Sequence, residues 1–218
     1  IKKTIFKSYL LLFCLLCISS VIGCHKPVQK ETATGFYFNT VISVTVYEPD
    51  SSDTSLNASA LTKKCMDMAA SYEQLFSRTV EGSDIWNINH SNGAPVTVAD
   101  DTIALLSTAL SYADLSDGLV DPTIGTLSTL WNFTGEMKTV PSDTNVEEAL
   151  SHVDYHSVII DGNQVTLTDS DACIDLGFIA KGYIADQMKK YLVSEGVTSA
   201  VINLGGNVLT IGSKPDGS

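Results

Sequence analysis

Basic residues are scarce in this sequence. The 218 residues include 13 lysines and arginines against 25 aspartates and glutamates, so the formal net charge is −12 at pH 7. A chain this acidic lacks the positive surface that binding to a nucleic acid backbone requires. We therefore expect no nucleic acid partner. A phosphate-rich ligand would need a metal ion or local positive groups.

Several sequence patterns of catalytic or metal-binding sites are also missing. The four histidines lie at positions 25, 90, 152 and 156 without the spacing of metal ligands, and there is no cysteine–histidine zinc pattern. No serine lies in a nucleophile-elbow sequence. Gly205-Gly206 is not a dinucleotide fingerprint, because no helix with a third glycine follows it. These absences argue against the usual zinc, serine hydrolase and Rossmann nucleotide sites.

The N-terminal segment resembles a targeting sequence. The apolar run 9–18 follows three lysines and is too short to span a bilayer comfortably. It leads to Val21-Ile22-Gly23-Cys24, which has the form of a bacterial lipobox. We expect residues 1–23 to be a lipoprotein signal peptide and Cys24 to carry a lipid that holds the chain at the membrane, outside the cytoplasm. A plain transmembrane anchor is the alternative. Residues 24–34 are predicted to be a polar tether.

Two cysteines, Cys65 and Cys173, lie beyond this N-terminal segment. They could form a disulfide, but one isolated pair of cysteines says little by itself. We favour two buried thiols, because Cys65 lies in a helical pattern and Cys173 lies in an apolar, strand-like run.

The length suits one large domain or two small ones. Hydrophobic periodicity predicts strands and helices that mix without strict alternation, which indicates an α+β fold. Asp100 or Asp101 is predicted to cap a helix, and a hairpin is predicted to turn at Gly162-Asn163. The chain ends just after a turn sequence, so we expect a C-terminal part to be missing. Strands are predicted at 36–47, 95–98, 158–168, 199–204 and 207–211, an extended segment at 172–176, and helices at 58–76, 83–88, 102–115, 124–131 (buried), 141–153 and 181–195.

The strongest candidate site is the stretch from Asp175 to Tyr183. A strand runs into a turn that contains Gly177, and a helix starts at once. Backbone N–H groups at such a helix start can hold an anion. Lys181 lies in the first turn, where the helix dipole disfavours a cation, and this placement hints at a function. The alternative is that Asp175 only caps the turn and that Lys181 is solvated.

Three further positions each allow two interpretations. Asp121 precedes Pro122, so its backbone is held extended and its side chain has a fixed direction; it could also cap a helix that starts at Pro122. Arg78 could meet a phosphate or form an internal salt bridge. Gly205-Gly206 could let the backbone approach a ligand, but alone it indicates an ordinary hairpin turn.

Together these segments resemble the ApbE family, the FAD:protein FMN transferases, from about Thr34 to the end of the chain. The order and spacing of several motifs carry the resemblance, and a lipobox is common among members. These motifs are Phe38-Asn39-Thr40, residues 77–89, residues 117–125 with Leu130-Trp131-Asn132-Phe133, residues 175–182, and Asn203-Leu204-Gly205-Gly206-Asn207.

The resemblance implies an ApbE-like transferase domain over residues 35–218, with mixed or antiparallel sheets, packed helices and an FAD site in a cleft between subdomains. Phe38 stands where the family usually has methionine, and Thr79 stands where an aromatic or polar FAD contact is common. Phe178 matches a position that supplies a metal ligand, and we expect its backbone carbonyl to bind Mg²⁺, because oxygen ligands suit this ion. The resemblance assigns FAD contacts to Phe38, Thr79, Leu119, Val120, Asp121, Asp175 and Lys181.

The resemblance also implies the reaction. The FMN half of FAD moves to a threonine or serine hydroxyl of a target flavoprotein and AMP leaves, with Mg²⁺ required. The family's catalytic segment and other metal ligands lie further toward the C-terminus, so no catalytic residue is assigned and we expect the chain alone to bind Mg²⁺ poorly and to be inactive. The alternatives are a Mg²⁺-dependent FAD pyrophosphatase and a non-catalytic flavin-binding lipoprotein. A solute-binding lipoprotein would need two similar lobes, and the sequence shows no such duplication.

Overall fold

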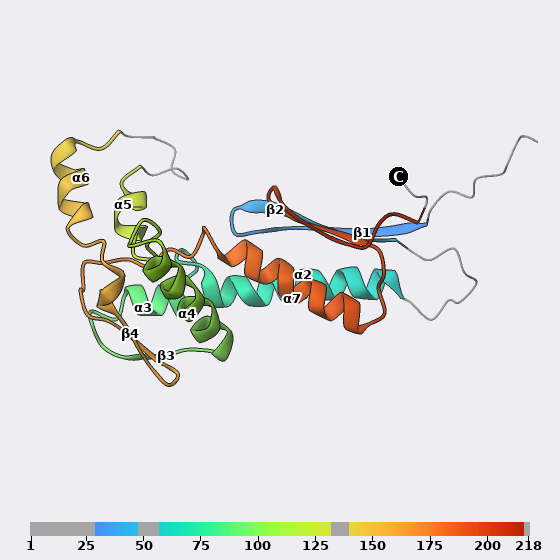
Figure 1. Cartoon of the computed structure of the whole chain (residues 1–218), viewed down its shortest axis with the longest axis horizontal. Helices are drawn as coiled ribbons and strands as arrows, with labels where there is room; N and C mark the ends of the chain where they lie inside the picture. The colour runs from blue at the N-terminus through green and yellow to red at the C-terminus, as the bar shows by residue number, and fades with distance from the viewer. Residues whose placement is uncertain (1–28, 48–56, 132–139, 216–218) are drawn as a thin grey trace, which may run out of the picture.

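The computed structural model describes residues 29–47, 57–131 and 140–215 (Figure 1). The predicted signal peptide, the predicted lipidation site Cys24 and the pair Asn132-Phe133 lie outside these ranges. Within them the chain forms two antiparallel sheets with packed helices, which confirms the predicted α+β class. None of the helices in these ranges is long and apolar enough to cross a bilayer.

The larger sheet has four strands in the order β1-β2-β6-β7, each antiparallel to its neighbour. Alternate residues of β2 form a buried row, in which Ile42, Val44 and Val46 are at most 1% exposed. A slip of one residue would turn this row to solvent, so the pattern specifies the register. The strands are β1 (Lys30–Tyr37), β2 (Thr40–Tyr47), β6 (Ala200–Leu204) and β7 (Asn207–Ile211).

Two long helices, α2 (Ala58–Phe76) and α7 (Ala180–Ser194), pack along this sheet (Figure 1). The rings of Tyr72 and Phe76 meet the ring of Tyr183 edge-on, with centroids 6.0 and 5.7 Å apart. The end of α2 therefore lies beside the beginning of α7.

The rest of the described chain holds a three-stranded sheet and the other helices (Figure 1). Its strand order is β3-β5-β4, and the β4–β5 hairpin turns at Gly162, as predicted. The elements are α3 (Asp84–Asn89), β3 (Val96–Thr97), α4 (Asp100–Leu115), α5 (Gly125–Thr129), α6 (Asp143–Leu150), the 3₁₀ helix η1 (Tyr155–Ser157), β4 (Val158–Asp161) and β5 (Gln164–Leu167).

The N-terminal strands differ from the prediction. A tether that extends to residue 34 is wrong, because β1 begins at Lys30. The predicted strand 36–47 is a hairpin, with Phe38 and Asn39 in its turn at φ values of 52° and 54°. No residue of β1 is fully buried. The sequence of β1 also lacks the apolar alternation by which a half-buried strand is recognised, so the pattern did not predict this strand from Lys30.

The start of α4 is capped differently from the prediction. Ala99 occupies the N-cap position without a side-chain hydrogen bond, so a cap by Asp100 or Asp101 is wrong. Asp84 of α3 takes this role across the fold, because its Oδ2 accepts hydrogen bonds from the Ala99 N–H at 2.9 Å and the Thr102 hydroxyl at 2.6 Å. The capping carboxylate belongs to another helix, which local sequence does not reveal.

The short helix α5 also departs from the predicted buried helix at 124–131. It spans only Gly125–Thr129, and Gly125 is its only buried residue. Gly125 packs so closely on Cys173 that a Cβ atom there would overlap the Cys173 carbonyl. Ile124 pairs with Cys173 in an isolated parallel bridge. Residues 172–176 are therefore held mainly by neighbours outside the two sheets.

Both described cysteines are free thiols, as the favoured interpretation predicted, although Cys173 is only half-buried. Burial raises the pKa of the Cys65 thiol to about 12. Burial also raises the pKa of Cys173, which the neighbouring Arg78 partly counteracts. Because the thiolate is the reactive form, both thiols are expected to react slowly with electrophiles.

We expect iodoacetamide at about pH 8 to leave Cys65 unmodified in the folded chain and to modify it after denaturation, because its thiolate is scarce and its sulfur is inaccessible. Peptide-resolved mass spectrometry measures the modification at each cysteine. Cys173 is the internal control and should react faster than Cys65. Equal native rates at the two positions would contradict the burial of Cys65.

Candidate functional site

The candidate site lies where the four-stranded sheet adjoins the part of the molecule that holds the three-stranded sheet. The β1–β2 turn, the β6–β7 turn and the start of α7 lie together there (Figure 1). The Gly205 N–H donates to the Val41 carbonyl at 3.1 Å, which joins the two turns. Gly182 of α7 lies against Asn207, since a Cβ atom on Gly182 would sit 3.9 Å from the Asn207 side-chain nitrogen. Motifs far apart in sequence thus form one region.

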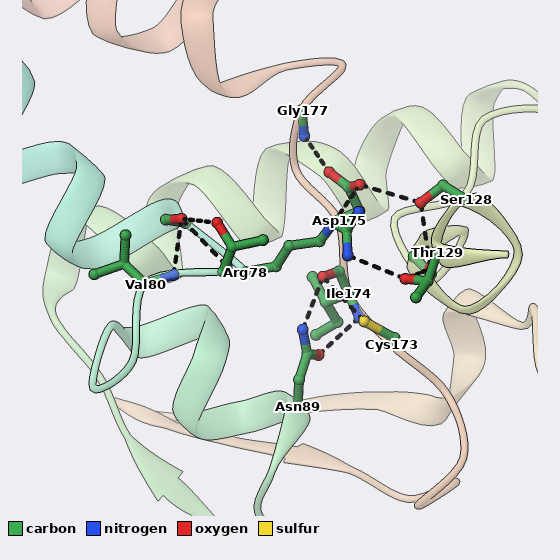
Figure 2. Close-up of polar contacts among 12 residues, drawn as sticks. Arg78, Val80, Asn89, Ser128, Thr129, Cys173, Ile174, Asp175 and Gly177 are labelled. Carbon is green, nitrogen blue, oxygen red and sulfur yellow. Dashed lines mark hydrogen bonds and ion pairs between the residues drawn. The ribbon is translucent and has the colours of Figure 1, made fainter. Parts of the chain in front are cut away.

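Asp175 is the most connected predicted residue of this region (Figure 2). Its Oδ2 accepts hydrogen bonds from the Arg78 Nε at 2.9 Å and the Ser128 hydroxyl at 3.3 Å. Its Oδ1 accepts from the Gly177 N–H at 2.8 Å. The Arg78 and Asp175 side chains are 29% and 24% exposed, so the pair is partly shielded from water. Arg78 therefore forms the internal salt bridge, and Asp175 braces the turn before α7.

Asn89, at the end of α3, holds the residue before Asp175 (Figure 2). Its side-chain amide donates to the Ile174 carbonyl at 2.9 Å and accepts from the Ile174 N–H at 2.7 Å. The backbone N–H of Asp175 donates to the Pro122 carbonyl at 2.8 Å. These bonds fix the segment on both sides and connect it to the loop that carries Leu119, Val120 and Asp121.

The beginning of α7 has open hydrogen-bond donors. Ile179 occupies the N-cap position without a side-chain bond, and the N–H groups of Ile179 and Ala180 both donate to the Leu176 carbonyl. Within the described chain, the N–H groups of Lys181 and Gly182 have no acceptor. The half-buried Lys181 side chain forms no ion pair there. Free N–H groups and a cation at a helix start can receive an anion.

Asp121 has a structural role in this fold. Its Oδ1 accepts from the N–H and hydroxyl of Thr123 at 2.7 and 2.6 Å, and its Oδ2 accepts from the Tyr155 N–H at 3.0 Å. The predicted helix start at Pro122 is wrong, because α5 begins at Gly125 with Ile124 at its N-cap, so Asp121 holds the loop before this helix and does not cap it. The neighbouring apolar side chains remain accessible, with Leu119 90% and Val120 36% exposed.

The remaining predicted contacts lie at the same region with different exposure. Phe38 is half-buried in the β1–β2 turn, and its N–H donates to Glu73 Oε1 at 2.6 Å. Thr79 is exposed next to Arg78, and its hydroxyl lies 3.2 Å from the Ser77 hydroxyl. Phe178 is 49% exposed in the turn before α7. All three side chains have surface available to a ligand.

Sequence reasoning missed several residues that support this region, namely Glu73, Asn89, Ser128 and Thr129. Asn89 stands at the end of a segment that carried the family resemblance, and this was its only signal. Glu73, Ser128 and Thr129 lie within predicted helices, where periodicity does not distinguish a polar contact from a solvated face.

A family model described as the ApbE family matches residues 38–218. The chain belongs to the ApbE family. It is 29% identical over 211 residues to the FAD:protein FMN transferase of Treponema pallidum (strain Nichols), a match that covers 93% of this chain and 58% of that protein. It is 35% identical over 156 residues to an FAD:protein FMN transferase of Klebsiella pneumoniae (strain 342), covering 70% and 49%.

Solved structures of the family share the fold. The flavin transferase ApbE from Vibrio cholerae superposes with a TM-score of 0.79 at 22% identity, covering 88% of this chain and 62% of that chain. The ApbE protein from Thermotoga maritima gives 0.77 at 32% identity, covering 85% and 60%. The chain therefore spans about 60% of each of these structures.

The Phe178 carbonyl is the predicted ligand for Mg²⁺. In the described chain the Phe178 carbonyl accepts no hydrogen bond, so it can donate one oxygen to a cation. Mg²⁺ prefers six oxygen ligands, and the nearby Asp175 carboxylate is engaged by Arg78. The described cluster of potential metal ligands is a different one, formed by His152, Asp169 and Asp171, whose ligand atoms lie within 4.8 Å of one another. The Phe178 carbonyl is thus open to a cation, and Mg²⁺ binding there stays a prediction.

We expect Gly205→Ala to destabilise the protein more than Gly206→Ala. Both residues have positive φ, at 63° and 96°, which costs an alanine about 1–2 kcal/mol. Only at Gly205 would the new methyl group overlap Thr40, which adds about 1–3 kcal/mol. Urea unfolding measures both free energies. Equal losses would contradict the close packing of the two turns.

The ion pair between His152 Nδ1 and Asp169 Oδ2, 2.8 Å apart, predicts a pH-dependent stability. The hydrogen bond to Asp169 raises the pKa of His152 above 6.5, and the same bond lowers the pKa of Asp169 below 3.8. The histidine's contribution is complete below pH 6.5 and is lost as pH rises through its folded pKa. The aspartate's contribution is complete above pH 3.8 and is lost as pH falls through its folded pKa.

His152→Gln should therefore lower the melting temperature at about pH 5.5, and the difference from wild type should shrink as pH rises through the raised pKa of His152. His156→Gln is the matched control, because the His156–Asp154 pair is 71% and 61% exposed and should matter less. Thermal unfolding followed by circular dichroism gives both series. A loss at His152 that does not change with pH would argue against the ion pair.

Proposed function

We propose that this chain supplies the FAD-binding part of an FAD:protein FMN transferase. The observation that carries the proposal is the beginning of α7, where the free N–H groups of Lys181 and Gly182 and the Lys181 ammonium group face no protein partner in the described chain. A pyrophosphate is the part of FAD that such donors recognise. Membership of the ApbE family, shown by the match over residues 38–218, supports this ligand.

The accessible apolar side chains around this helix start suit the flavin and the exclusion of water. Phe38, Leu119 and Val120 come from two separate loops of the region. Covering them with a flat ring system removes apolar surface from water, which favours binding. Excluding water also favours transfer, because water is the competing acceptor of the FMN group. Asp175 adds no apolar surface. It supports the site by accepting the hydrogen bond from the Gly177 N–H in the turn before α7.

The reaction is a phosphoryl transfer. The oxygen of a threonine or serine hydroxyl on the target flavoprotein bonds to the FMN phosphorus, and the bond from that phosphorus to the bridging pyrophosphate oxygen breaks. AMP leaves with the bridging oxygen, and the hydroxyl proton passes to a general base, to which no residue of this chain is assigned. Phe178 would contribute its carbonyl oxygen to a bound Mg²⁺, which supplies positive charge against the pyrophosphate.

We further propose that the chain acts at a membrane, outside the cytoplasm, through a lipid on Cys24. The lipobox form of Val21-Ile22-Gly23-Cys24 supports this anchor. Its target would then be a flavoprotein in the same compartment. Replacement of Cys24 by alanine should release the protein from the membrane fraction.

Lys181→Ala should raise the Kd for FAD about 10- to 100-fold, because a hydrogen bond to a charged group contributes about 1.5–3 kcal/mol. Lys189→Ala is the matched control, since Lys189 is an exposed lysine on the same helix. Flavin fluorescence titration of the intact protein measures both. Equal affinities for the two variants would remove the main support for phosphate binding at α7.

Incubation of the intact protein with FAD, Mg²⁺ and a candidate acceptor tests the reaction itself. We expect intact-mass spectrometry to show one added FMN on the acceptor, with release of AMP. Free FMN and AMP without a modified acceptor would indicate a pyrophosphatase. Binding of FAD without AMP release would indicate a non-catalytic flavin carrier.

A further inference from the structure

Arg78 is the only arginine in the chain, and the fold uses it inside the candidate site. Its Nε donates to Asp175 Oδ2 at 2.9 Å, and its Nη1 donates to the Thr129 hydroxyl at 3.0 Å (Figure 2). Thr129 donates in turn to the Gly125 carbonyl at 2.8 Å. One guanidinium group thus ties the loop after α2 to α5 and to the segment before α7.

Arg78 balances the negative charge of Asp175 and holds its carboxylate in place. In the described chain no other basic side chain forms an ion pair with this carboxylate. Without Arg78, a carboxylate that is only 24% exposed would lose its ion-pair partner and keep only the hydrogen bonds from Ser128 and the Gly177 N–H. Such a group is costly, and it would repel any anion that approaches the neighbouring helix start.

The second oxygen of Asp175 transmits this position to the phosphate-binding donors. Asp175 Oδ1 accepts from the Gly177 N–H, and the open N–H groups of Lys181 and Gly182 follow within five residues. Asn89 fixes Ile174 just before, so the side chain of Asp175 lies between this fixed residue and the turn that leads to α7. Arg78 determines how that side chain lies.

We propose that Arg78 is a positioning residue for the FAD site, acting through Asp175 and making no contact with the phosphates itself. The proposal rests on the proposed function, since it assumes that the beginning of α7 binds the pyrophosphate. Arg78 neutralises Asp175 and holds its Oδ1 on the Gly177 N–H. The arginine therefore improves phosphate binding indirectly, although it is a natural candidate for a direct phosphate contact.

A double-mutant cycle separates the two roles. Arg78→Gln should raise the Kd for FAD about tenfold or more, because it leaves the Asp175 charge without its partner. In an Asp175→Asn background the same change should cost less than about threefold, because the charge that needed a partner has gone. Flavin fluorescence titration of the intact protein gives the four affinities. Equal losses in both backgrounds would mean that Arg78 contacts the ligand directly, which would overturn the proposal.

A measurement without FAD tests the positioning directly. Hydrogen exchange of residues 174–182 in the ligand-free protein should be faster in Arg78→Gln than in wild type, and Arg78→Lys should restore part of the protection. Unchanged exchange together with weakened FAD binding would contradict a positioning role. The native circular dichroism spectrum of each variant confirms that it is folded, and the Arg78→Gln/Asp175→Asn double variant covers the case in which Arg78→Gln alone unfolds.

The outcomes distinguish this inference from the proposed function. A wild-type protein that takes up no FAD would contradict the transferase function and with it the ligand of this site. A wild-type protein that binds FAD but shows additive losses in the cycle would contradict only the indirect role of Arg78.

Discussion

The half-buried ion pair between Arg78 and Asp175 is the contact on which the arrangement of the candidate site depends. It joins the loop after α2 to the segment before α7, and the Thr129 hydroxyl adds α5 to the same guanidinium group. Partly buried charges cost desolvation energy, which hydrogen bonds must offset. Here Ser128 and the Gly177 N–H supply those bonds to the carboxylate. The pair therefore specifies geometry as well as charge.

Helix α7 connects the two halves of the fold through this contact. It begins beside the end of α2 and then runs back along the four-stranded sheet (Figure 1). Tyr183 secures its first turns, because the ring packs on Phe76 and the hydroxyl donates to Asp101 at 2.6 Å. The open donors of Lys181 and Gly182 are consequently held by elements from both halves. Neither sheet alone would present them.

The overall acidity of the chain makes these local donors important. With a net charge of −12 and its single arginine engaged by Asp175, the described chain leaves Lys181 and backbone N–H groups as the positive side of the site. An anion can bind to an acidic protein in this way because the interactions are short-range and oriented. A divalent cation, as proposed for the reaction, would reinforce the same electrostatics.

The sequence by itself determined the family and most of the regular elements. Apolar periodicity was sufficient to predict α2, and turn glycines were sufficient to predict the β4–β5 and β6–β7 hairpins. Both signals come from residues that are close together in the sequence. Only the tertiary structure decided that Arg78 pairs with Asp175, 97 positions away, that Asp84 caps α4, and that β1 belongs to the sheet. A charged or polar side chain can form a hydrogen bond or an ion pair with many different groups. The fold selects one of them by bringing it within hydrogen-bond distance.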